Sequence, residues 1–253
     1  MSDSLRSKVI RLAHTNPALR PHLLPLLAGS GRVAAGDFNI PGNHILGKAK
    51  VSGNAKVSDN AVVTDNARVQ DFAVVAGNAV VRDFAVVAGK AVVVGDAQVS
   101  GDARVFMDAR VSMDAEVNQR AQVFGSAQVG DRAEVSGFAK VGGKAVVSGK
   151  AKVFDDAVVV GEARVGGGAM VSGNARVEGW ANVYAEVRDN ALVTDTAMVF
   201  GNAEVYGNAK VYGGARISGK ARIGGTAVIL GGSWNGSEGE ITSGTWEGPG
   251  VPG

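Results

Sequence analysis

The residues best suited to acid–base or metal chemistry are confined to one end of this chain. Its three histidines are His14, His22 and His44, and it contains no cysteine. A general base is most often a histidine, and a zinc site needs three or four nitrogen, sulfur or oxygen ligands at fixed geometry. Residues 45–253 contain neither histidine nor cysteine. The sequence therefore predicts no catalytic residue, no cofactor and no metal site.

Aspartates that recur every six residues are the remaining candidates for a metal site. The two runs are Asp59, Asp65 and Asp71, and Asp96, Asp102, Asp108 and Asp114. Calcium needs six to eight oxygens that converge on one point, and aspartates on different corners of a coil cannot converge. Asp is also a common turn residue, because its side chain bonds nearby backbone groups. The turn role is therefore the preferred interpretation.

A six-residue repeat positions these side chains. The unit V-x-[GD]-x-A-x fills residues 45–182, a four-residue unit occupies 183–186, and the repeat resumes over 187–228. A period of six does not fit a helix, and Gly or Asp in most units would destabilise one. Each unit therefore predicts a short strand with Val inside, a corner at Gly or Asp, and a small inward Ala beside it. The short unit lacks the turn pair, so one corner should be cut there.

Charges at the fourth position of the unit indicate how many units close one coil. If three units close it, residues eighteen apart stack at about 4.8 Å, the usual spacing of neighbouring strands. Opposite charges then stack at four places, against one like pair, Asp96 over Asp114. The four are Lys90 over Asp108, Asp102 over Arg120, Asp114 over Arg132, and Lys144 over Glu162. The sequence predicts an all-β, three-sided parallel β-helix of about ten 18-residue coils, roughly 50 Å long.

Residues 45–231 resemble the hexapeptide-repeat, left-handed parallel β-helix family. The resemblance rests on an aliphatic residue followed four positions later by a small one, as in Val51 and Ala55 or Val57 and Ala61. The left-handed winding is what the resemblance implies. Gly comes two positions after the aliphatic residue here, not directly after it as in many acyltransferases of the family. The chain is thus more similar to tandem-repeat members from phages and bacteria.

The N-terminal part predicts a separate segment. Residues 1–30 favour a short helical segment, because Ser4 and Asn16 suit helix N-caps and leucines follow at helical spacing. This segment either caps the first coil or docks into a larger assembly, and docking is preferred. The leucines of the docking face are Leu19, Leu23, Leu24, Leu26 and Leu27. Residues 31–44 are expected to form a linker to the repeat.

The C-terminal part predicts a cap. The repeat pattern ends at residue 231, and residues 232–253 are rich in Gly and include two tryptophans, Trp234 and Trp246. A parallel solenoid exposes unpaired backbone at its end, so a cap is a physical requirement. We expect a loop that folds over the last coil with these tryptophans as plugs and ends in a mobile tail.

Two groups of outward side chains are candidates for contact with a partner. An apolar belt on the second and third coils comprises Val62, Val74, Val80, Val86, Val92 and Val94. The family resemblance implies side-by-side trimers, which such a belt would suit, although Val also favours strands in general. Phe72, Phe84, Phe138 and Trp180 are expected at corners, and Phe106 is expected to stack on Phe124. These aromatics could bind a glycan or a protein, or stabilise the sheets themselves.

The charge pattern limits the partners expected. A formal net charge of +2 comes from 26 basic and 24 acidic residues that are interspersed along the chain. Without a basic block, nucleic acid is not expected as a ligand. No membrane span and no signal peptide are recognisable, so the expected location is the cytoplasm or a virion.

Two functions follow as hypotheses. The first is a non-catalytic structural or assembly protein: a rigid rod anchored by residues 1–30, assembled as a homo-oligomer or docked to a larger complex, with a phage virion as one setting. The second is an acyltransferase-like enzyme. Enzymes of the resembled family use a histidine base and a covering loop, and the coils have neither, so its site would form between subunits with His14, His22 or His44. The first hypothesis is preferred.

Overall fold

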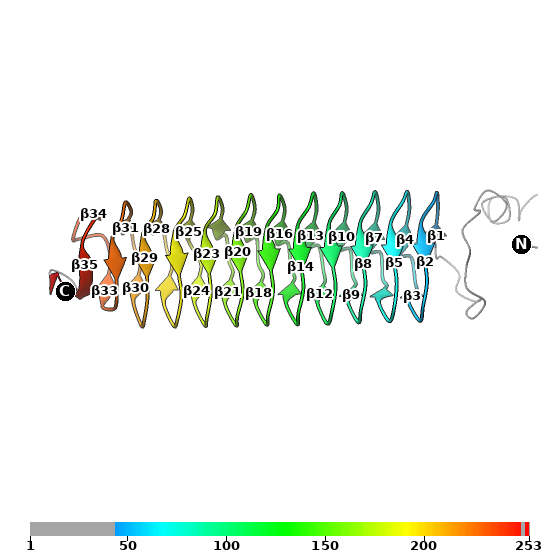
Figure 1. Cartoon of the computed structure of the whole chain (residues 1–253), viewed down its shortest axis with the longest axis horizontal. Helices are drawn as coiled ribbons and strands as arrows, with labels where there is room; N and C mark the ends of the chain where they lie inside the picture. The colour runs from blue at the N-terminus through cyan, green and yellow to red at the C-terminus, as the bar shows by residue number, and fades with distance from the viewer. Residues whose placement is uncertain (1–43, 249–250, 253) are drawn as a thin grey trace, which may run out of the picture.

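The chain winds as a parallel β-solenoid. This computed structural model describes residues 44–248 and 251–252 (Figure 1). Successive strands belong to three sheets in turn, so each turn adds one strand to each sheet. All pairs are parallel except the last, β35 with β36. The predicted all-β, three-sided architecture is confirmed, and the described part contains no helix.

The sheets have 12, 13 and 11 strands and are named here sheets I, II and III. Sheet I consists of β1 (His44–Ile45), β4 (Val62–Val63), β7 (Val80–Val81), β10 (Gln98–Val99), β13 (Glu116–Val117), β16 (Glu134–Val135), β19 (Lys152–Val153), β22 (Met170–Val171), β25 (Glu186–Val187), β28 (Glu204–Val205), β31 (Arg222–Ile223) and β34 (Glu240–Ile241). Sheet II consists of β2 (Lys50–Val51), β5 (Arg68–Val69), β8 (Val86–Val87), β11 (Arg104–Val105), β14 (Gln122–Val123), β17 (Lys140–Val141), β20 (Val158–Val159), β23 (Arg176–Val177), β26 (Leu192–Val193), β29 (Lys210–Val211), β32 (Val228–Ile229), β35 (Thr245–Gly248) and β36 (Val251–Pro252). Sheet III consists of β3 (Lys56–Val57), β6 (Val74–Val75), β9 (Val92–Val93), β12 (Arg110–Val111), β15 (Gln128–Val129), β18 (Val146–Val147), β21 (Arg164–Val165), β24 (Asn182–Val183), β27 (Met198–Val199), β30 (Arg216–Ile217) and β33 (Ser233–Trp234).

The register of the sheets confirms three units per coil. Lys140 pairs with Val158, a separation of eighteen residues, and the same offset holds along most of each sheet. Across the short unit the offset falls to sixteen, as in Met170 opposite Glu186. That corner is a bend at Tyr184 and Ala185 alone, so the predicted cut corner is confirmed. The shorter corner keeps every later strand on its sheet.

The interior holds one Val or Ile and one Ala from each unit. Both residues are fully buried over most of the length, as with Val135 and Ala139. Alternate strand residues point in opposite directions, so the residue before each Val points outward and forms the face of the prism. The methyl side chain of Ala leaves room for the chain to turn beside it. The core is therefore a narrow column of small aliphatic side chains.

Each corner depends on one residue in the left-handed backbone region. Gly161 has a φ of +77° and Asp155 a φ of 58°, and the third position of the other full units is similar. Gly adopts this region without steric cost, and Asp tolerates it better than most residues. This requirement explains the Gly and Asp that punctuate the repeat.

Backbone hydrogen bonds join each coil to the next at both the strand and the corner. In one unit the N–H groups of Lys140, Gly142 and Lys144 donate to the carbonyls of Ala157, Val159 and Gly161, at 2.9, 2.9 and 2.7 Å. The same pattern recurs from coil to coil. The ladder thus continues around the corners, which stiffens the stack against bending.

The C-terminal segment differs from its expected loop. Beyond residue 231 the sheets continue through β33, β34 and β35, which pair with β30, β31 and β32. Sheet III reaches 11 strands, so the stack has about eleven turns rather than ten. The strand β36 then turns back and pairs antiparallel with β35, which occupies the final edge of sheet II. Large side chains here replace Val and Ala, so the six-residue pattern ends before the fold does.

The predicted N-terminal helical segment and most of the linker lie outside the described residues, and so do the side chains of the five leucines from Leu19 to Leu27. Within the described part no helix is long and apolar enough to cross a membrane.

The corner geometry predicts where Gly can be replaced. We expect Gly161→Ala to lower the free energy of unfolding by about 1–2 kcal/mol, because a left-handed φ is unfavourable for Ala and the new Cβ would lie 2.8 Å from the backbone oxygen of Gly179. Gly161→Asn should cost less, since Asn tolerates this region.

Gly168→Ala is the matched control, because its added Cβ meets nothing within 4 Å. Urea denaturation followed by circular dichroism measures all three variants. Equal losses at Gly161 and Gly168 would contradict the corner requirement.

Candidate binding surface

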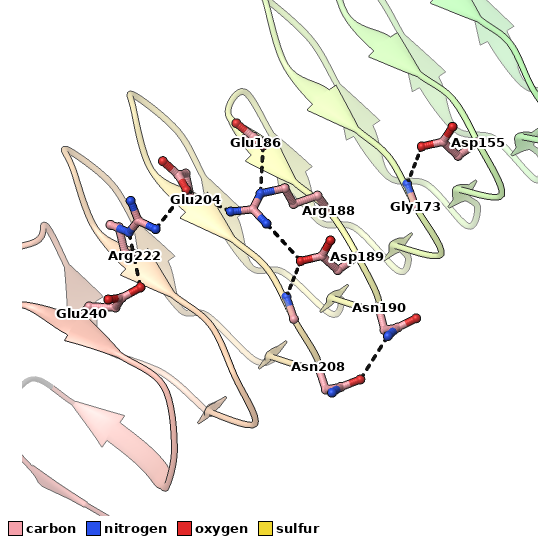
Figure 2. A network of polar contacts seen from close by, with 11 residues as sticks. Asp155, Gly173, Glu186, Arg188, Asp189, Asn190, Glu204, Asn208, Arg222 and Glu240 are labelled. Atoms are coloured by element: carbon pink, nitrogen blue, oxygen red, sulfur yellow. Dashed lines mark hydrogen bonds and ion pairs between the residues drawn. The ribbon is translucent and has the colours of Figure 1, made fainter.

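The aspartates at the third position of the unit cap backbone N–H groups of the next coil, whereas those of the second run stand at the fourth position and bond side chains, as when Asp96 accepts from Asn78 Nδ2 at 2.8 Å. Asp83 accepts a hydrogen bond from the N–H of Gly101 at 2.9 Å, and Asp155 accepts one from the N–H of Gly173 at 3.1 Å (Figure 2). Asp59, Asp65, Asp71, Asp131, Asp189 and Asp195 do the same. Their carboxylates thus serve the turn, and their partners are one coil away rather than local. Within the described residues no three acidic or histidine side chains gather as a metal site would require.

The predicted stacking of charges at corners is largely observed. Ion pairs join Asp102 to Arg120 at 3.7 Å, Asp114 to Arg132 at 3.5 Å and Lys144 to Glu162 at 3.0 Å. Within the described residues, no ion pair joins Lys90 to Asp108. The predicted stack of Phe106 on Phe124 is also present, with ring centroids 5.6 Å apart. Exposed ion pairs stabilise the fold only a little, but these pairs confirm that one coil contains eighteen residues.

Lys144 and Trp180 act together on one corner carboxylate. The Lys144 ammonium lies 3.0 Å from Glu162 Oε1, and Trp180 Nε1 donates to Glu162 Oε2 at 3.2 Å. The hydrogen bond and charge of Lys144, followed by the Trp180 bond, lower the pKa of Glu162.

The charges of face I, the outward side of sheet I, largely neutralise one another. Arg222 lies 3.7 Å from Glu204 and 3.4 Å from Glu240 (Figure 2). At the adjoining corner Arg188 reaches Glu186 and Asp189, each at 3.0 Å. Further along, Lys152 pairs with Glu134 at 3.0 Å. The carboxylates of this face are thus mostly engaged with nearby cations.

Face II, the outward side of sheet II, carries cations and no acidic residue on its strands from β2 to β32. From β5 to β29 a cation stands on every second strand, and β2 adds one more at the start; the residues are Lys50, Arg68, Arg104, Lys140, Arg176 and Lys210. All six are exposed. The intervening strands carry half-buried Val86, Gln122, Val158, Leu192 and Val228. Only Arg176 has an ion-pair partner in the described chain, Glu178.

Face III, the outward side of sheet III, is also free of acidic residues on its strands. Its cations stand on every third strand and are Lys56, Arg110, Arg164 and Arg216. Basic residues that are interspersed along the sequence therefore form rows on faces II and III of the folded chain. Residues 36 apart are scattered in the sequence but become neighbours on one face, because two coils contain 36 residues.

A hollow of about 500 Å³ lies along face II. Its floor consists of one residue from each of five consecutive strands, namely Val86, Arg104, Gln122, Lys140 and Val158. Its wall consists of the matching corner residues between sheets I and II, namely Phe84, Asp102, Arg120, Phe138 and Asp156. Five strands span roughly 19 Å. The hollow is therefore an elongated groove parallel to the rod axis.

Two exposed phenyl rings frame the wall of this groove. The side chains of Phe84 and Phe138 are 61% and 52% exposed and lie three coils apart, about 14 Å. Between them Arg120 is held by Asp102 and lies 5.2 Å from the ring centre of Phe138. A second hollow of about 310 Å³ occupies the corner itself between the same two rings. The groove thus combines apolar rings with fixed charges.

The valines of the predicted belt are half-buried and distributed around the prism. Val62 and Val80 are neighbours on face I, and Val74 and Val92 are neighbours on face III. Val86 lies on face II between Arg68 and Arg104. Val94 lies at the corner after β9. Each face therefore receives only a small part of the belt, and a contact between subunits there stays a prediction.

The two tryptophans line the end of the core. Trp234 is fully buried, and its ring meets that of Trp246 edge to face at 5.8 Å. Each indole N–H donates to a backbone carbonyl at 2.8 Å, Trp234 to Gly231 and Trp246 to Ser243. These rings occupy space that Val and Ala fill in the regular coils.

The comparison with known proteins gives one short similarity. A family model for the YdcK beta solenoid repeat matches residues 97–113, which include β10, β11 and β12. The chain is similar to that repeat over slightly less than one coil, which agrees with the solenoid architecture. No curated protein matches the chain.

The corner bonds predict a difference between two substitutions of one aspartate. Asp83→Ala should lower the free energy of unfolding by about 1–2 kcal/mol, because it leaves the Gly101 N–H without its acceptor and places Ala at positive φ. Asp83→Asn keeps an oxygen acceptor and should cost much less. Thermal and urea unfolding measure both. If Asn is as damaging as Ala, the carboxylate charge and not the hydrogen bond matters.

The lowered pKa of Glu162 predicts a pH-dependent contribution from Lys144. A carboxyl with a lower pKa in the folded state stabilises the fold above its unfolded pKa, and this stability is lost as the pH falls through the folded pKa. We expect Lys144→Met to raise the pKa of Glu162 and to reduce stability at pH 7 but not in acid. A carboxyl carbon NMR titration measures the pKa, and Lys150→Met, on another corner, should leave it unchanged.

Proposed function

We propose that this protein is a non-catalytic structural protein, a rigid rod that holds the segments at its ends at a fixed separation. The observation that carries the proposal is the unbroken stack of three sheets from β1 to β35, with its fully buried column of Val, Ile and Ala. Every regular coil repeats the same strands and the same tight corners. Such regularity serves constant shape rather than the assembly of dissimilar side chains around a substrate.

The backbone bonding supports a mechanical role. Bending the rod would stretch the coil-to-coil hydrogen bonds on one side, including those at the corners. Side-chain ladders reinforce the corners, because Asn174 donates to Asn190 at 3.1 Å and Asn190 donates to Asn208 at 3.2 Å (Figure 2). The stack resists deformation through many equivalent small contributions and not through one critical contact.

The finer features of the proposal concern assembly. Residues 1–30 would anchor the rod through Leu19, Leu23, Leu24, Leu26 and Leu27, and the valine belt would support a homotrimer. The resemblance of the repeat to tandem-repeat proteins of phages and bacteria, an expectation from the sequence, would suit a role in a larger particle such as a virion. The acyltransferase alternative requires His14, His22 or His44 at a subunit boundary, and it would release a free thiol from an acyl thioester. That release is directly measurable with the full chain.

The anchor predicts a separable N-terminal function. A chain of residues 31–253 should keep the far-ultraviolet circular dichroism and the rod length of the full chain, because the coils bond only to one another in the described part. It should lose self-association or capture of a partner, measured by light scattering and small-angle X-ray scattering. The full chain with Leu23→Ser and Leu26→Ser should behave in the same way. Unchanged assembly in both variants would contradict the docking role.

The belt predicts a position-dependent effect on oligomerisation. We expect Val80→Glu together with Val92→Glu to convert an oligomer to monomer, because charges would replace apolar contact on faces I and III. Val146→Glu, an equivalent outward residue of β18 outside the belt, is the matched control. Analytical ultracentrifugation measures the mass. A monomeric wild-type chain, or equal effects of both changes, would contradict a contact through the belt.

A further inference from the structure

The groove on face II has the shape and charge of a site for an extended polymer. Its floor crosses β8, β11, β14, β17 and β20, so it is elongated along the rod and open to solvent on its outer side. A compact small molecule would fill only part of it. A chain molecule lying parallel to the rod axis would contact several strands in succession.

The spacing of the floor cations restricts the kind of polymer. Arg104 and Lys140 stand two strands apart, about 10 Å, with Gln122 between them. Neither cation has an ion-pair partner in the described chain, unlike Lys152 on face I. The same two-strand period continues from Arg68 to Lys210 along face II. A matching ligand therefore carries negative groups about 10 Å apart along a line, with neutral parts between them.

Other charged polymers fit this spacing less well. A nucleic acid strand in a duplex carries a phosphate every 3.4 Å or so, far more densely than the cations stand. An extended peptide presents side chains on one side every 7 Å or so, twice its rise per residue. A polysaccharide with a charge on every second sugar matches the spacing of the cations better, because two pyranose rings span nearly the distance between alternate strands.

The wall suits sugar rings. The exposed phenyl rings of Phe84 and Phe138 offer apolar surfaces against which the C–H faces of pyranose rings can pack. Gln122 and Asp156 can accept hydrogen bonds from hydroxyl groups, while Arg104 can bind a carboxylate through two N–H groups. Arg120 is already near Asp102 and the ring of Phe138, so Arg104 and Lys140 on the floor are the cations left for the ligand.

We propose that the face II groove binds a linear acidic polysaccharide whose alternate sugars carry a carboxylate. Arg104 and Lys140 bind successive carboxylates, Gln122 faces the neutral sugar between them, and Phe84 and Phe138 pack on ring faces. The two-strand period of cations beyond the groove lets a longer chain continue along the rod. This role is independent of the rod proposal, since a groove on a flexible or enzymatic protein could bind the same ligand.

Calorimetry with the full chain tests the proposal. The probes are two octasaccharides in which glucuronate alternates with N-acetylglucosamine, one of the hyaluronan type and one of the heparosan type. We expect at least one of them to bind saturably. Arg104→Gln with Lys140→Gln should weaken that binding about tenfold or more, as expected for loss of two charge-assisted contacts, and should reduce its salt dependence.

Matched variants separate the site from general charge. Arg110→Gln with Arg164→Gln removes two exposed cations of face III at the same position of the unit and should leave the affinity nearly unchanged. Phe84→Ser with Phe138→Ser should weaken binding without altering its salt dependence. Circular dichroism confirms that each variant is folded.

Several results would overturn the proposal. The absence of binding by both octasaccharides at millimolar concentration would do so. Equal weakening of binding by the face II and face III variants would also overturn it. Equally tight binding of an uncharged N-acetylglucosamine oligomer would exclude a role for the carboxylates. Tighter binding of oligothymidylate or of phosphatidylserine vesicles, lost in the Arg104 and Lys140 variant, would assign the groove to nucleic acid or to a membrane surface.

Discussion

The structure depends on the hydrogen bonding of each coil to the next in a fixed register. Parallel strands must pair at every strand and every corner, so each coil has to bring the chain back to the same place after three sides. This closure requires a left-handed residue at each regular corner, which is Gly or Asp except at Met107, Met113 and Gln119, and a small residue inside it, which is Ala. Once the register is fixed, the outward residues are free to vary, and they carry whatever distinguishes one face from another.

Much of the fold could be predicted because the closure requirement is expressed in every unit. Val135 and Ala139 lie where the pattern places them, and pairs such as Asp114 and Arg132 made the number of units per coil testable from the sequence. The end of the stack could not be predicted in the same way. Trp234 and Trp246 fill the interior with different shapes, so the strands β33 to β35 continue without the letters of the repeat.

The candidate site was not predicted, although its signal was present in the sequence. Arg68, Arg104 and Lys140 are separated by 36 residues, and a search for a continuous basic block overlooks them. Taking every third unit separately, once the coil length is known, would have separated the cationic face II from the acid-rich face I. The groove itself depends on Phe84 and Phe138 lining it beside the floor residues, and the six-residue pattern does not show that.

The short unit at residues 183–186 shows how such a chain can change length during evolution. A corner can lose two residues and leave each later strand on its own sheet, as the pairing of Arg176 with Leu192 demonstrates. Loss of one whole six-residue unit would instead move every later strand to the adjoining face, so the aligned cations of face II would be divided between faces. Duplication or deletion of an eighteen-residue stretch would lengthen or shorten the rod and leave each later strand on its own face. The set of side chains on each face is therefore preserved when whole coils are gained or lost, and not when single six-residue units are.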